Sequence, residues 1–332
     1  MSTYTAINLI ARPAPGPVSS DIFEVVENQI PSAAPGQILV KQTHMSLDPA
    51  MLGWMNPDPE SYIPPVALGD VMRSSGVGEI VESNHPDFAV GERVMGMMGW
   101  AEYVVTSGEG LNKVPPGPDA ETVLSVFALP GLTATQGLFG FAKPKPGETI
   151  VVSGAAGSVG SIVGQLAKAE GLNVIGVAGS DEKCDWIVKE LGFDGAINYK
   201  SDEIEARLAK LAPGGIDIYF ENTGGPVQQH VFDRMNAHGR IVVCGMIADY
   251  GKEVPSAGPN WIPIIKKRLT IHGFAMPDHL GQVQELLAKL TPYVMQGKIK
   301  YRAHVLEGLE SAIDGLNMFF TGANKGKLMV KL

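Results

Sequence analysis

The chain has 332 residues, of which 45% are hydrophobic and 18% charged, a length and composition that predict two globular domains with a substantial core. Its formal net charge of −9 argues against a binding surface for nucleic acid or for an anionic membrane. No leader pattern and no uninterrupted apolar run of membrane length is visible, and the two cysteines, Cys184 and Cys244, do not form a disulfide framework. These features predict a cytoplasmic protein.

The first third of the chain has the pattern of short strands broken by proline and glycine. Six such runs lie at residues 6–11, 23–27, 37–43, 76–82, 93–96 and 101–105. Regular short strands with turn signals between them predict an antiparallel domain resembling a β-barrel. An apolar segment at residues 121–142 follows, and we expect it to be helical.

From residue 149 to residue 274, strand patterns alternate with helical ones. The strands are expected at 150–153, 173–178, 196–198, 216–220, 240–244 and 269–274. This alternation predicts an α/β domain with a doubly wound parallel sheet. A helix at 280–296 and a strand, helix and strand at 300–332 follow, and we expect this tail to return to the first domain. The predicted domains are 1–122 completed by 297–332, and 123–296.

The first strand of this α/β region leads into a turn rich in small residues, Ala155-Ala156-Gly157-Ser158-Val159-Gly160. Apolar residues then recur at helical spacing until Gly171. The turn departs from the G-x-G-x-x-G pattern only by alanine at its first position. Gly157 would let a pyrophosphate approach the backbone, and Gly160 would let the helix pack closely. A tight turn that binds nothing would show the same pattern.

The second strand ends at Gly179-Ser180-Asp181-Glu182-Lys183, where such folds contact the adenosine ribose. An NAD site usually has an acidic residue at this strand end, whereas this chain has Gly179 and Ser180, with Lys183 one turn further. A hydroxyl group and a cation suit a 2′-phosphate. The segment therefore predicts NADPH as the cofactor, although Ser180 is equally suited to cap a helix.

Metal chemistry has little support in the sequence. Two cysteines cannot supply a four-cysteine zinc site, and the seven histidines lack the spacing of a catalytic zinc site. We expect no metal, and therefore favour hydride transfer in which a side chain polarises the substrate oxygen.

Five motifs, taken in order, resemble those of a known family. They are GAAGSVG at 154–160, GSDEK at 179–183, ENTGG at 221–225, CGMIADY at 244–250 and GANKGK at 322–327. Over essentially the whole chain the sequence resembles the zinc-independent medium-chain dehydrogenase/reductases, in the branch of leukotriene B4 12-hydroxydehydrogenase (prostaglandin reductase) and the alkenal double-bond reductases. The resemblance implies a GroES-like first domain, a Rossmann second domain, NADPH, a homodimer, and reduction of the C=C bond of α,β-unsaturated ketones and aldehydes.

The resemblance also implies roles for individual residues. Those expected to bind the cofactor are Gly157, Ser158, Val159 and Gly160 at the pyrophosphate, Ser180, Lys183 and Tyr199 at the 2′-phosphate and adenine, and Asn222, Cys244, Gly245, Met246, Phe274, Met276 and Asn324 along the remainder of the cofactor. Simpler roles exist for several of them: Tyr199 as a half-buried strand aromatic, Asn222 and Asn324 as turn residues, and Phe274 as a core residue.

Tyr250 is the candidate catalytic residue, because similar enzymes place a tyrosine in the corresponding G-x-I-x-x-Y segment against the substrate carbonyl. Hydride addition at the β-carbon drives negative charge onto that oxygen. A hydroxyl donor already directed at it is worth about 2.7–4 kcal/mol in comparable oxyanion sites. The alternative is a loop aromatic that only makes packing contacts.

The chain departs from its relatives near residue 50. Many of them have D-P-Y-M-R, whereas this sequence has Asp48-Pro49-Ala50-Met51-Leu52, so that Ala50 replaces the tyrosine and Leu52 the arginine. The departure implies a larger, more apolar pocket for a small hydrophobic substrate. Trp54, Tyr62 and Met72 are candidates to line it, although such residues are more often plain core.

Two other functions stay open. A quinone oxidoreductase of the same superfamily would share the cofactor domain and differ in its product, and a non-catalytic NADPH-binding protein would turn over neither substrate. The apolar strand at 269–274 is a candidate for pairing across the two-fold axis of a homodimer.

Overall fold

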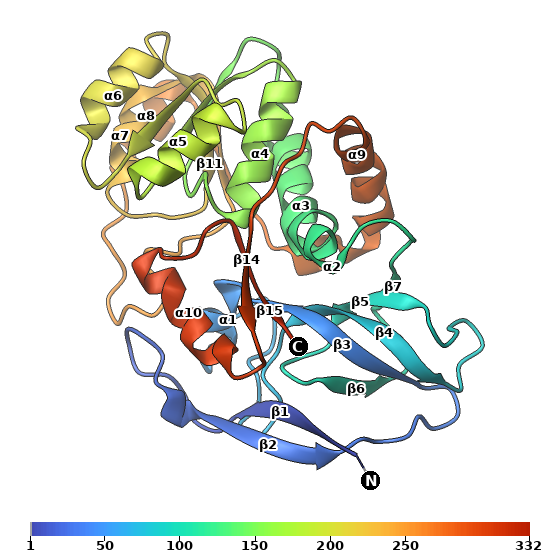
Figure 1. The fold of residues 1–332 in the computed structure, drawn as a ribbon. Helices are drawn as coiled ribbons and strands as arrows, with labels where there is room; N and C mark the ends of the chain where they lie inside the picture. Colours follow the sequence, from blue (N-terminus) through green and yellow to red (C-terminus); the bar gives the residue numbers. More distant parts are fainter. Residues whose placement is uncertain (1) are drawn as a thin grey trace. The chain divides into compact units, whose positions relative to one another are not determined.

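The structure is a computed structural model that describes residues 2–332, and it forms two compact units (Figure 1). The first comprises the chain up to Ala128 together with Ala303–Leu332, and the second is Leu129–Arg302. Both boundaries lie a few residues later than those expected from the sequence, after residues 122 and 296. The apolar helical segment runs across the first boundary, so that no change of composition marks it.

The first unit is rich in β-structure. Its strands are β1 (Thr3–Leu9), β2 (Phe23–Gln29), β3 (Ile38–Ser46), β4 (Ser75–Ser83), β5 (Arg93–Met97), β6 (Tyr103–Thr106), β7 (Asn112–Lys113), β14 (Ala303–Glu307) and β15 (Lys327–Lys331). Its helical elements are η1 (Ser20–Ile22), α1 (Ala50–Trp54), α2 (Ala120–Thr122), η2 (Val123–Phe127) and α10 (Ser311–Thr321).

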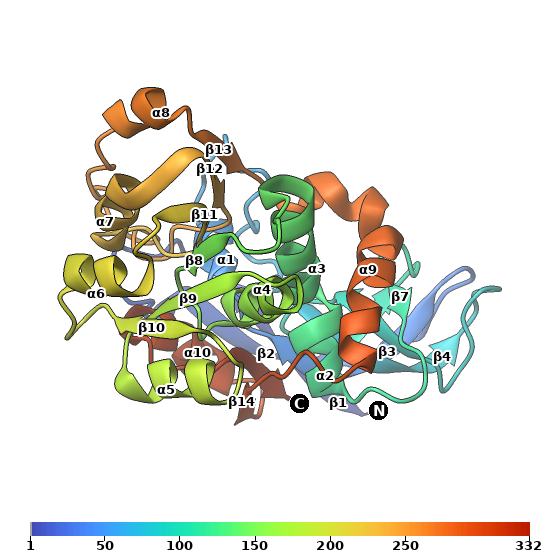
Figure 2. The ribbon, with the colours of Figure 1, turned by 90° about the horizontal axis from the view of Figure 1, so that it is seen from above.

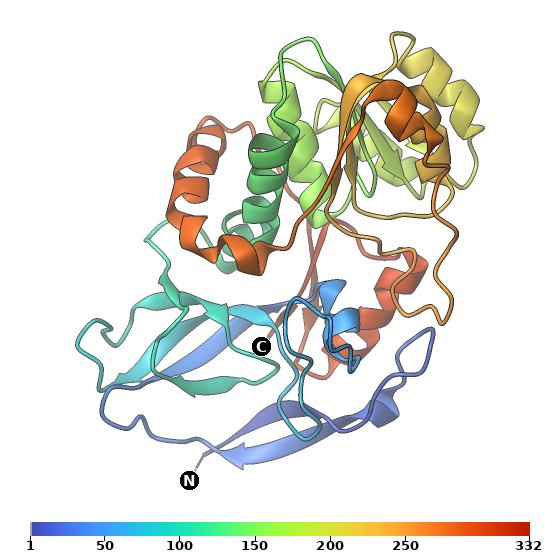
Figure 3. The same cartoon turned by 180° about the vertical axis from the view of Figure 1, so that it is seen from behind.

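Seven of these strands form one sheet, in the order β14-β15-β3-β4-β5-β7 with β6 paired to β3, and β1 and β2 form a separate two-stranded sheet (Figure 3). All neighbours are antiparallel except β14 and β15. The predicted return of the tail is confirmed, because β15 pairs with β3 through Met329 and Ser46. Helix α1 was not expected from the sequence.

A buried ion pair connects the returning tail to the start of α1. The side chain of Lys327 is 2% exposed, and its Nζ donates to Asp48 Oδ1 at 2.6 Å and to the Leu47 carbonyl at 3.0 Å. The hydroxyl of Ser46 also contacts both Lys327 and Asp48. These hydrogen bonds hold the start of the Asp48-Pro49-Ala50 segment against β15. Loss of either charged partner would leave an uncompensated buried charge.

The second unit is built around six strands, β8 (Thr149–Val152), β9 (Asn173–Ala178), β10 (Gly195–Asn198), β11 (Ile216–Glu221), β12 (Met235–Val243) and β13 (Thr270–Gly273). Its helical elements are α3 (Leu129–Thr135), η3 (Gln136–Ala142), α4 (Ser158–Ala169), α5 (Asp181–Lys189), α6 (Ile204–Leu211), α7 (Val227–Arg234), α8 (Ile262–Lys267), η4 (Met276–Gln282) and α9 (Val283–Met295).

These strands form a fully parallel sheet in the order β10-β9-β8-β11-β12-β13. Counted along the chain this order is 3-2-1-4-5-6, which is the order of dinucleotide-binding domains. Figure 2 shows α4 on one side of the sheet and α6 and α7 on the other. The predicted doubly wound α/β domain is therefore confirmed.

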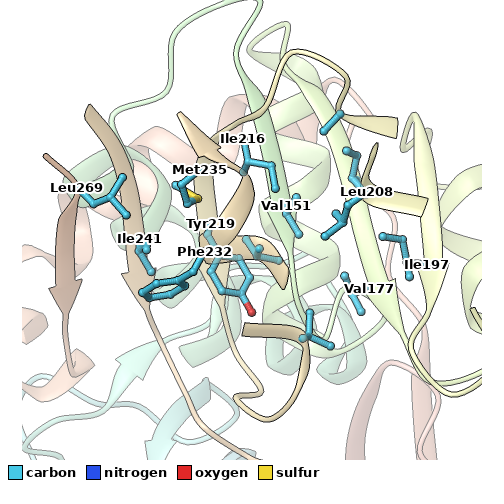
Figure 4. Packing of buried hydrophobic residues seen from close by; sticks show 14 residues of the cluster. Val151, Val177, Ile197, Leu208, Ile216, Tyr219, Phe232, Met235, Ile241 and Leu269 are labelled. Carbon is cyan, nitrogen blue, oxygen red and sulfur yellow. The ribbon is translucent and has the colours of Figure 1, made fainter. Parts of the chain in front are cut away.

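Apolar side chains fill the space between this sheet and α6 and α7 (Figure 4). Val151, Ile175 and Ile241 come from three strands, and Leu208 and Phe232 come from the helices. Burial of such side chains on both faces explains why the strands are nearly continuous apolar runs in the sequence. Tyr219 belongs to the same cluster, and its hydroxyl lies near the carboxyl end of the sheet.

The segment at 121–142 is helical as expected, and it is divided into several helical elements. Ala128, between η2 and α3, has extended backbone dihedrals (φ −85°, ψ −158°). We expected no apolar run of membrane length, yet residues 120–142 are long and apolar enough to cross a membrane by length and composition alone. A core helix has the same composition, and 72% of the most apolar window is buried.

Candidate cofactor and active site

The centre of the parallel sheet defines where a ligand is expected in the second unit. Strands β8 and β11 are neighbours, but the chain leaves β8 towards β9 on one side and β11 towards β12 on the other. Ligands of such sheets bind in the crevice outside the carboxyl ends of the strands at this switch point. The segments that follow Val152, Glu221 and Val243 are therefore the candidate site.

The turn after β8 owes its shape to two glycines. Gly154 has a φ of +58°, a left-handed conformation that glycine adopts without strain. A Cβ on Gly160 would lie 2.4 Å from the Gly154 carbonyl oxygen, so that only glycine allows α4 to start this close to the strand. The predicted role of Gly160 in packing is thus confirmed. The residue that makes the tight turn is Gly154, one position before the alanine that departs from the pattern.

The start of α4 fits a pyrophosphate. Gly157 is the N-cap residue and supplies no side-chain cap to the helix, so the first amide groups of α4, at Ser158, Val159 and Gly160, point outwards from the helix start. Free amides at a helix N-terminus bind anions, and the helix dipole adds to the attraction. Helix α4 ends at Ala169, and Gly171 has a φ of +81°, which confirms the predicted stop.

Asn222 connects the ends of the two central strands. Its backbone N donates to Ser153 Oγ at 2.8 Å, and its side-chain Nδ2 donates to the Ser153 carbonyl at 2.7 Å. Its own carbonyl accepts from Ile247 N at 3.4 Å. Asn222 therefore lies between the turn after β8 and the loop after β12, and the side-chain bond to Ser153 accounts for the turn-fixing role that the sequence left open.

Glu221 was not singled out from the sequence, although it is central to this arrangement. Its side chain is 0% exposed, and its Oε1 accepts from the backbone N of Thr223 at 2.8 Å and of Gly224 at 3.0 Å. Ser153 Oγ donates to the same oxygen, and the Tyr219 hydroxyl donates to Oε2 at 2.5 Å. Burial and the charge of Glu221 raise the pKa of Tyr219 well above its ordinary value.

Three of the residues expected at the 2′-phosphate lie close together. Ser180 caps α5, its Oγ accepting from Lys183 N at 3.3 Å, as the alternative role suggested. Tyr199 is 43% exposed, and its hydroxyl oxygen lies 3.1 Å from the position of a Cβ on Gly179. The Nζ of Lys200, a residue not predicted from the sequence, lies 5.9 Å from the centre of the Tyr199 ring. The Tyr199 ring and hydroxyl thus lie against Gly179, and Lys200 lies beside the same ring.

The loop between β12 and α8 carries the candidate catalytic tyrosine. Ala248 N donates to the Thr223 carbonyl at 2.8 Å, which ties the loop to the turn after β11. The Tyr250 hydroxyl accepts from Met246 N at 3.3 Å, and it lies 3.5 Å from the position of a Cβ on Gly245. A phenol can accept and donate at the same time. Tyr250 is thus held at the carboxyl end of β12, close to Gly245.

Asp249 stabilises this loop. Its Oδ1 accepts from Lys252 Nζ at 2.9 Å, from Ser256 Oγ at 2.6 Å and from Ser256 N at 3.0 Å. Burial alone would raise the pKa of Asp249, but these hydrogen bonds outweigh it and the pKa is lowered. A pocket of about 300 Å³ lies beside the loop, lined by residues that include Gly225, Gln228 and Ser256.

Cys244 follows β12 directly. Burial, followed by the negative charge of Glu221, raises its pKa to about 12. The thiolate is the nucleophilic form of cysteine, and the raised pKa disfavours it.

Phe274 and Met276 contact a different part of the second unit. Met276 is buried in a cluster with Leu132 and Leu286. The ring of Phe274 is centred 5.1 Å from that of Phe141. These contacts agree with the alternative role of Phe274 as a core residue. They lie with Leu132, Leu286 and Phe141 and do not involve Tyr250 or Asn222.

The candidate substrate residues belong to the first unit. Ala50 and Trp54 lie in α1, where Trp54 is buried and Ala50 is half-buried. Tyr62 is exposed, whereas Met72 is 0% exposed and is therefore a core residue of this unit. Asn324, from the tail, donates from Nδ2 to the Gly326 carbonyl at 3.2 Å. Within residues 2–332, no group of three or more His, Cys, Asp or Glu side chains is arranged to hold a metal ion.

Comparisons with known proteins agree with this arrangement. Residues 6–114 match the family model described as the N-terminal domain of oxidoreductase, and residues 158–291 match that of zinc-binding dehydrogenase. The chain is 38% identical over 98% of its length to the NADPH-dependent curcumin reductase of Escherichia coli (strain K12), covering 95% of that protein. It is 40% identical over 88% of its length to the NADP(+)-dependent 2-alkenal reductase of Nicotiana tabacum, covering 86% of it.

Among solved structures, CurA from Vibrio vulnificus in complex with NADPH matches with a TM-score of 0.92 and 38% identity, over 98% of both chains. Fold, glycine turn and comparisons together define an NADPH-dependent oxidoreductase with a Rossmann domain. The chain belongs to the zinc-independent branch of the medium-chain dehydrogenase/reductase family.

The position of Lys183 leads to a prediction about cofactor choice. A charge-assisted hydrogen bond to a 2′-phosphate is worth about 1.5–3 kcal/mol, so Lys183→Ala should raise the KM for NADPH roughly ten- to hundredfold and leave the KM for NADH nearly unchanged. Lys189→Ala is the matched control, because Lys189 lies on the same helix and pairs with Asp185 in solvent. Equal effects of Lys183→Ala on both cofactors would contradict the assignment.

Proposed function

We propose that the protein reduces the C=C bond of α,β-unsaturated ketones and aldehydes with NADPH. The observation that carries the proposal is the position of Tyr250, whose hydroxyl is held beside Gly245 at the carboxyl end of β12. The loop with Tyr250 is hydrogen-bonded to the segment that follows Glu221. A hydroxyl donor thus lies next to the segments at which this fold binds its dinucleotide.

When bound, NADPH supplies the hydride that adds to the β-carbon of the substrate. Tyr250 would donate its O–H to the substrate carbonyl, whose oxygen becomes negatively charged as the enolate forms. Because the loop is already fixed by Asp249 and Ala248, the donor needs little reorganisation, which is the condition for strong oxyanion stabilisation. Protonation of the α-carbon, by water or through a relay, would then complete the reaction.

The cofactor would be held by the residues that surround the switch point. We propose that Gly157, Ser158, Val159 and Gly160 hold the pyrophosphate, that Ser180, Lys183 and Tyr199 hold the 2′-phosphate and adenine, and that Asn222, Cys244, Gly245 and Met246 border the nicotinamide. Phe274, Met276 and Asn324 remain proposals that rest on the family resemblance alone. The backbone amides of Ser158, Val159 and Gly160 suit the phosphates of a dinucleotide.

The substrate is proposed to be small and hydrophobic. Ala50 replaces the tyrosine that many relatives have, and Leu52, which replaces their arginine, is buried in the first unit. Both changes remove polar groups from α1. The relatives are named for curcumin and 2-alkenals, which are unsaturated carbonyl compounds, and this favours a C=C reductase over a quinone oxidoreductase or a non-catalytic NADPH-binding protein.

The direct test is the product formed by the purified protein with NADPH. We expect NADPH oxidation with a medium-chain enone and with an aryl vinyl ketone, and mass spectrometry should identify the saturated ketone. A saturated ketone offered as substrate should give no turnover. If only a quinone is reduced, the quinone oxidoreductase alternative is correct; NADPH binding without any turnover would support the non-catalytic one.

Tyr250→Phe tests the proposed donor. The variant keeps the ring and loses the hydroxyl, so the turnover number should fall about 10²- to 10³-fold, as for the loss of one oxyanion donor, with NADPH affinity nearly unchanged. Tyr103→Phe, in the first unit where Tyr103 packs on Tyr4, should not alter turnover. Full activity of Tyr250→Phe would show that another group polarises the carbonyl.

We also propose a cytoplasmic homodimer. Strand β13 is one of the two edge strands of the parallel sheet, with Thr270 and His272 exposed. Ile265 on α8 is 82% exposed. An uncovered edge strand with apolar neighbours can pair with its symmetry mate. Sedimentation velocity should give about twice the chain mass of 35.2 kDa, and a monomer over the micromolar range would rule the dimer out. Cell fractionation would test the compartment.

A further inference from the structure

Glu221 is a buried carboxylate with no cationic partner in the described part of the chain. Ser153, Thr223 and Gly224 donate hydrogen bonds to its Oε1, and Tyr219 donates to its Oε2. All of these donors are neutral groups. Burying a charge is costly unless it is paired or fully hydrogen-bonded, and here the second condition is met.

Oε1 of Glu221 acts only as an acceptor, because the backbone N–H groups of Thr223 and Gly224 can only donate. The hydroxyl of Ser153 already accepts from Asn222 N at 2.8 Å, which orients its own hydrogen towards Oε1. The negative charge of Glu221 contributes to the raised pKa values of Tyr219 and Cys244, and it has hydrogen-bond donors but no counter-ion among the described residues.

This charge lies at the carboxyl ends of the central strands. The backbone carbonyl of Glu221 accepts from Cys244 N at 2.8 Å and from Gly245 N at 3.2 Å. The Glu221 side chain accepts a hydrogen bond from Ser153, the residue before Gly154, and Asn222 is also hydrogen-bonded to Ser153. The electrostatic effect extends into the loop after β12, because the Glu221 charge contributes, after burial, to the raised pKa of Cys244.

A fixed negative charge at this position distinguishes the two redox states of the cofactor. The oxidised nicotinamide ring carries one positive charge, whereas the reduced ring is neutral. The phosphate groups are the same in both states, so their repulsion by Glu221 cancels when the two affinities are compared. What remains is attraction between the carboxylate and the oxidised ring, which is strong inside a protein of low effective dielectric constant.

We propose that the buried carboxylate of Glu221 makes the site bind NADP⁺ more tightly, relative to NADPH, than the same site would without this charge. The proposal rests on the proposed placement of the nicotinamide beside Asn222 and Gly245. By stabilising the oxidised ring, Glu221 favours hydride release from the bound cofactor. Glu221 is thus an electrostatic positioning residue that acts on the ring's charge without a role in proton transfer.

The test compares dissociation constants, so it needs no substrate. For the full-length protein and its variants, NADPH binding is followed by cofactor fluorescence and NADP⁺ binding by competition. Glu221→Gln is nearly isosteric, since its carbonyl can keep the donors on Oε1 and its amide can donate to the Tyr219 oxygen. We expect this variant to raise the ratio Kd(NADP⁺)/Kd(NADPH) about three- to thirtyfold, the range for one charge acting over roughly 8–25 Å at an effective dielectric constant near 20.

Tyr219→Phe is the matched control. Tyr219→Phe removes the hydrogen bond from Tyr219 to Glu221 Oε2 and leaves the carboxylate in place. The ratio Kd(NADP⁺)/Kd(NADPH) should therefore stay at the wild-type value or fall. An equal increase of both dissociation constants in Glu221→Gln would overturn the proposal in favour of a purely structural role. If Glu221→Gln does not fold, the same ratio is measured for Glu221→Ala, which also removes the charge, and an unchanged ratio in that variant would overturn the proposal. Enone reduction is assayed separately, so its absence would not affect this outcome.

Discussion

The hydrogen bonds around one buried carboxylate connect the two halves of the parallel sheet where they diverge. Glu221 ends β11, Ser153 follows β8, and the turn at Thr223 and Gly224 leads away from both. Without these donors, the buried carboxylate of Glu221 would have no hydrogen-bond partners to compensate for its loss of water. Ser153 precedes the glycine turn before α4, and Cys244 and Gly245 begin the loop that carries Tyr250. Because all three are hydrogen-bonded to Glu221, this residue fixes the positions of the turn and the loop relative to each other.

Local patterns were sufficient to predict much of the fold. The strand, turn and helix around Gly160, the helix stop at Gly171 and the return of the tail to the first unit were all expected, since each depends on neighbouring residues or on a simple alternation of strands. Glu221 was missed because its partner Ser153 is 68 residues away, and Lys327 because Asp48 is 279 residues away. The break at Ala128 lies in an apolar run, and its sequence signal is Pro130 two residues later, which suits the first turn of a new helix.

The chain also shows how an acidic protein can bind an anionic dinucleotide. With a net charge of −9, the overall field does not attract phosphate groups. Affinity must therefore come from groups close to the phosphates, and we propose the backbone amides at the start of α4 together with the hydroxyl and lysine groups of Ser180 and Lys183. Such short-range contacts are less sensitive to salt than a general positive surface would be.

The place of β15 has a consequence for how the protein is made. The sheet of the first unit runs β14-β15-β3, and β15 supplies Lys327, the buried partner of Asp48. A ribosome therefore releases the last strand of this sheet only after the whole of the second unit has been synthesised. Because domains fold as units while the chain emerges, the second unit can fold first. The part of β3 from His44 to Ser46 lacks its β15 partner until Lys327–Lys331 has been synthesised.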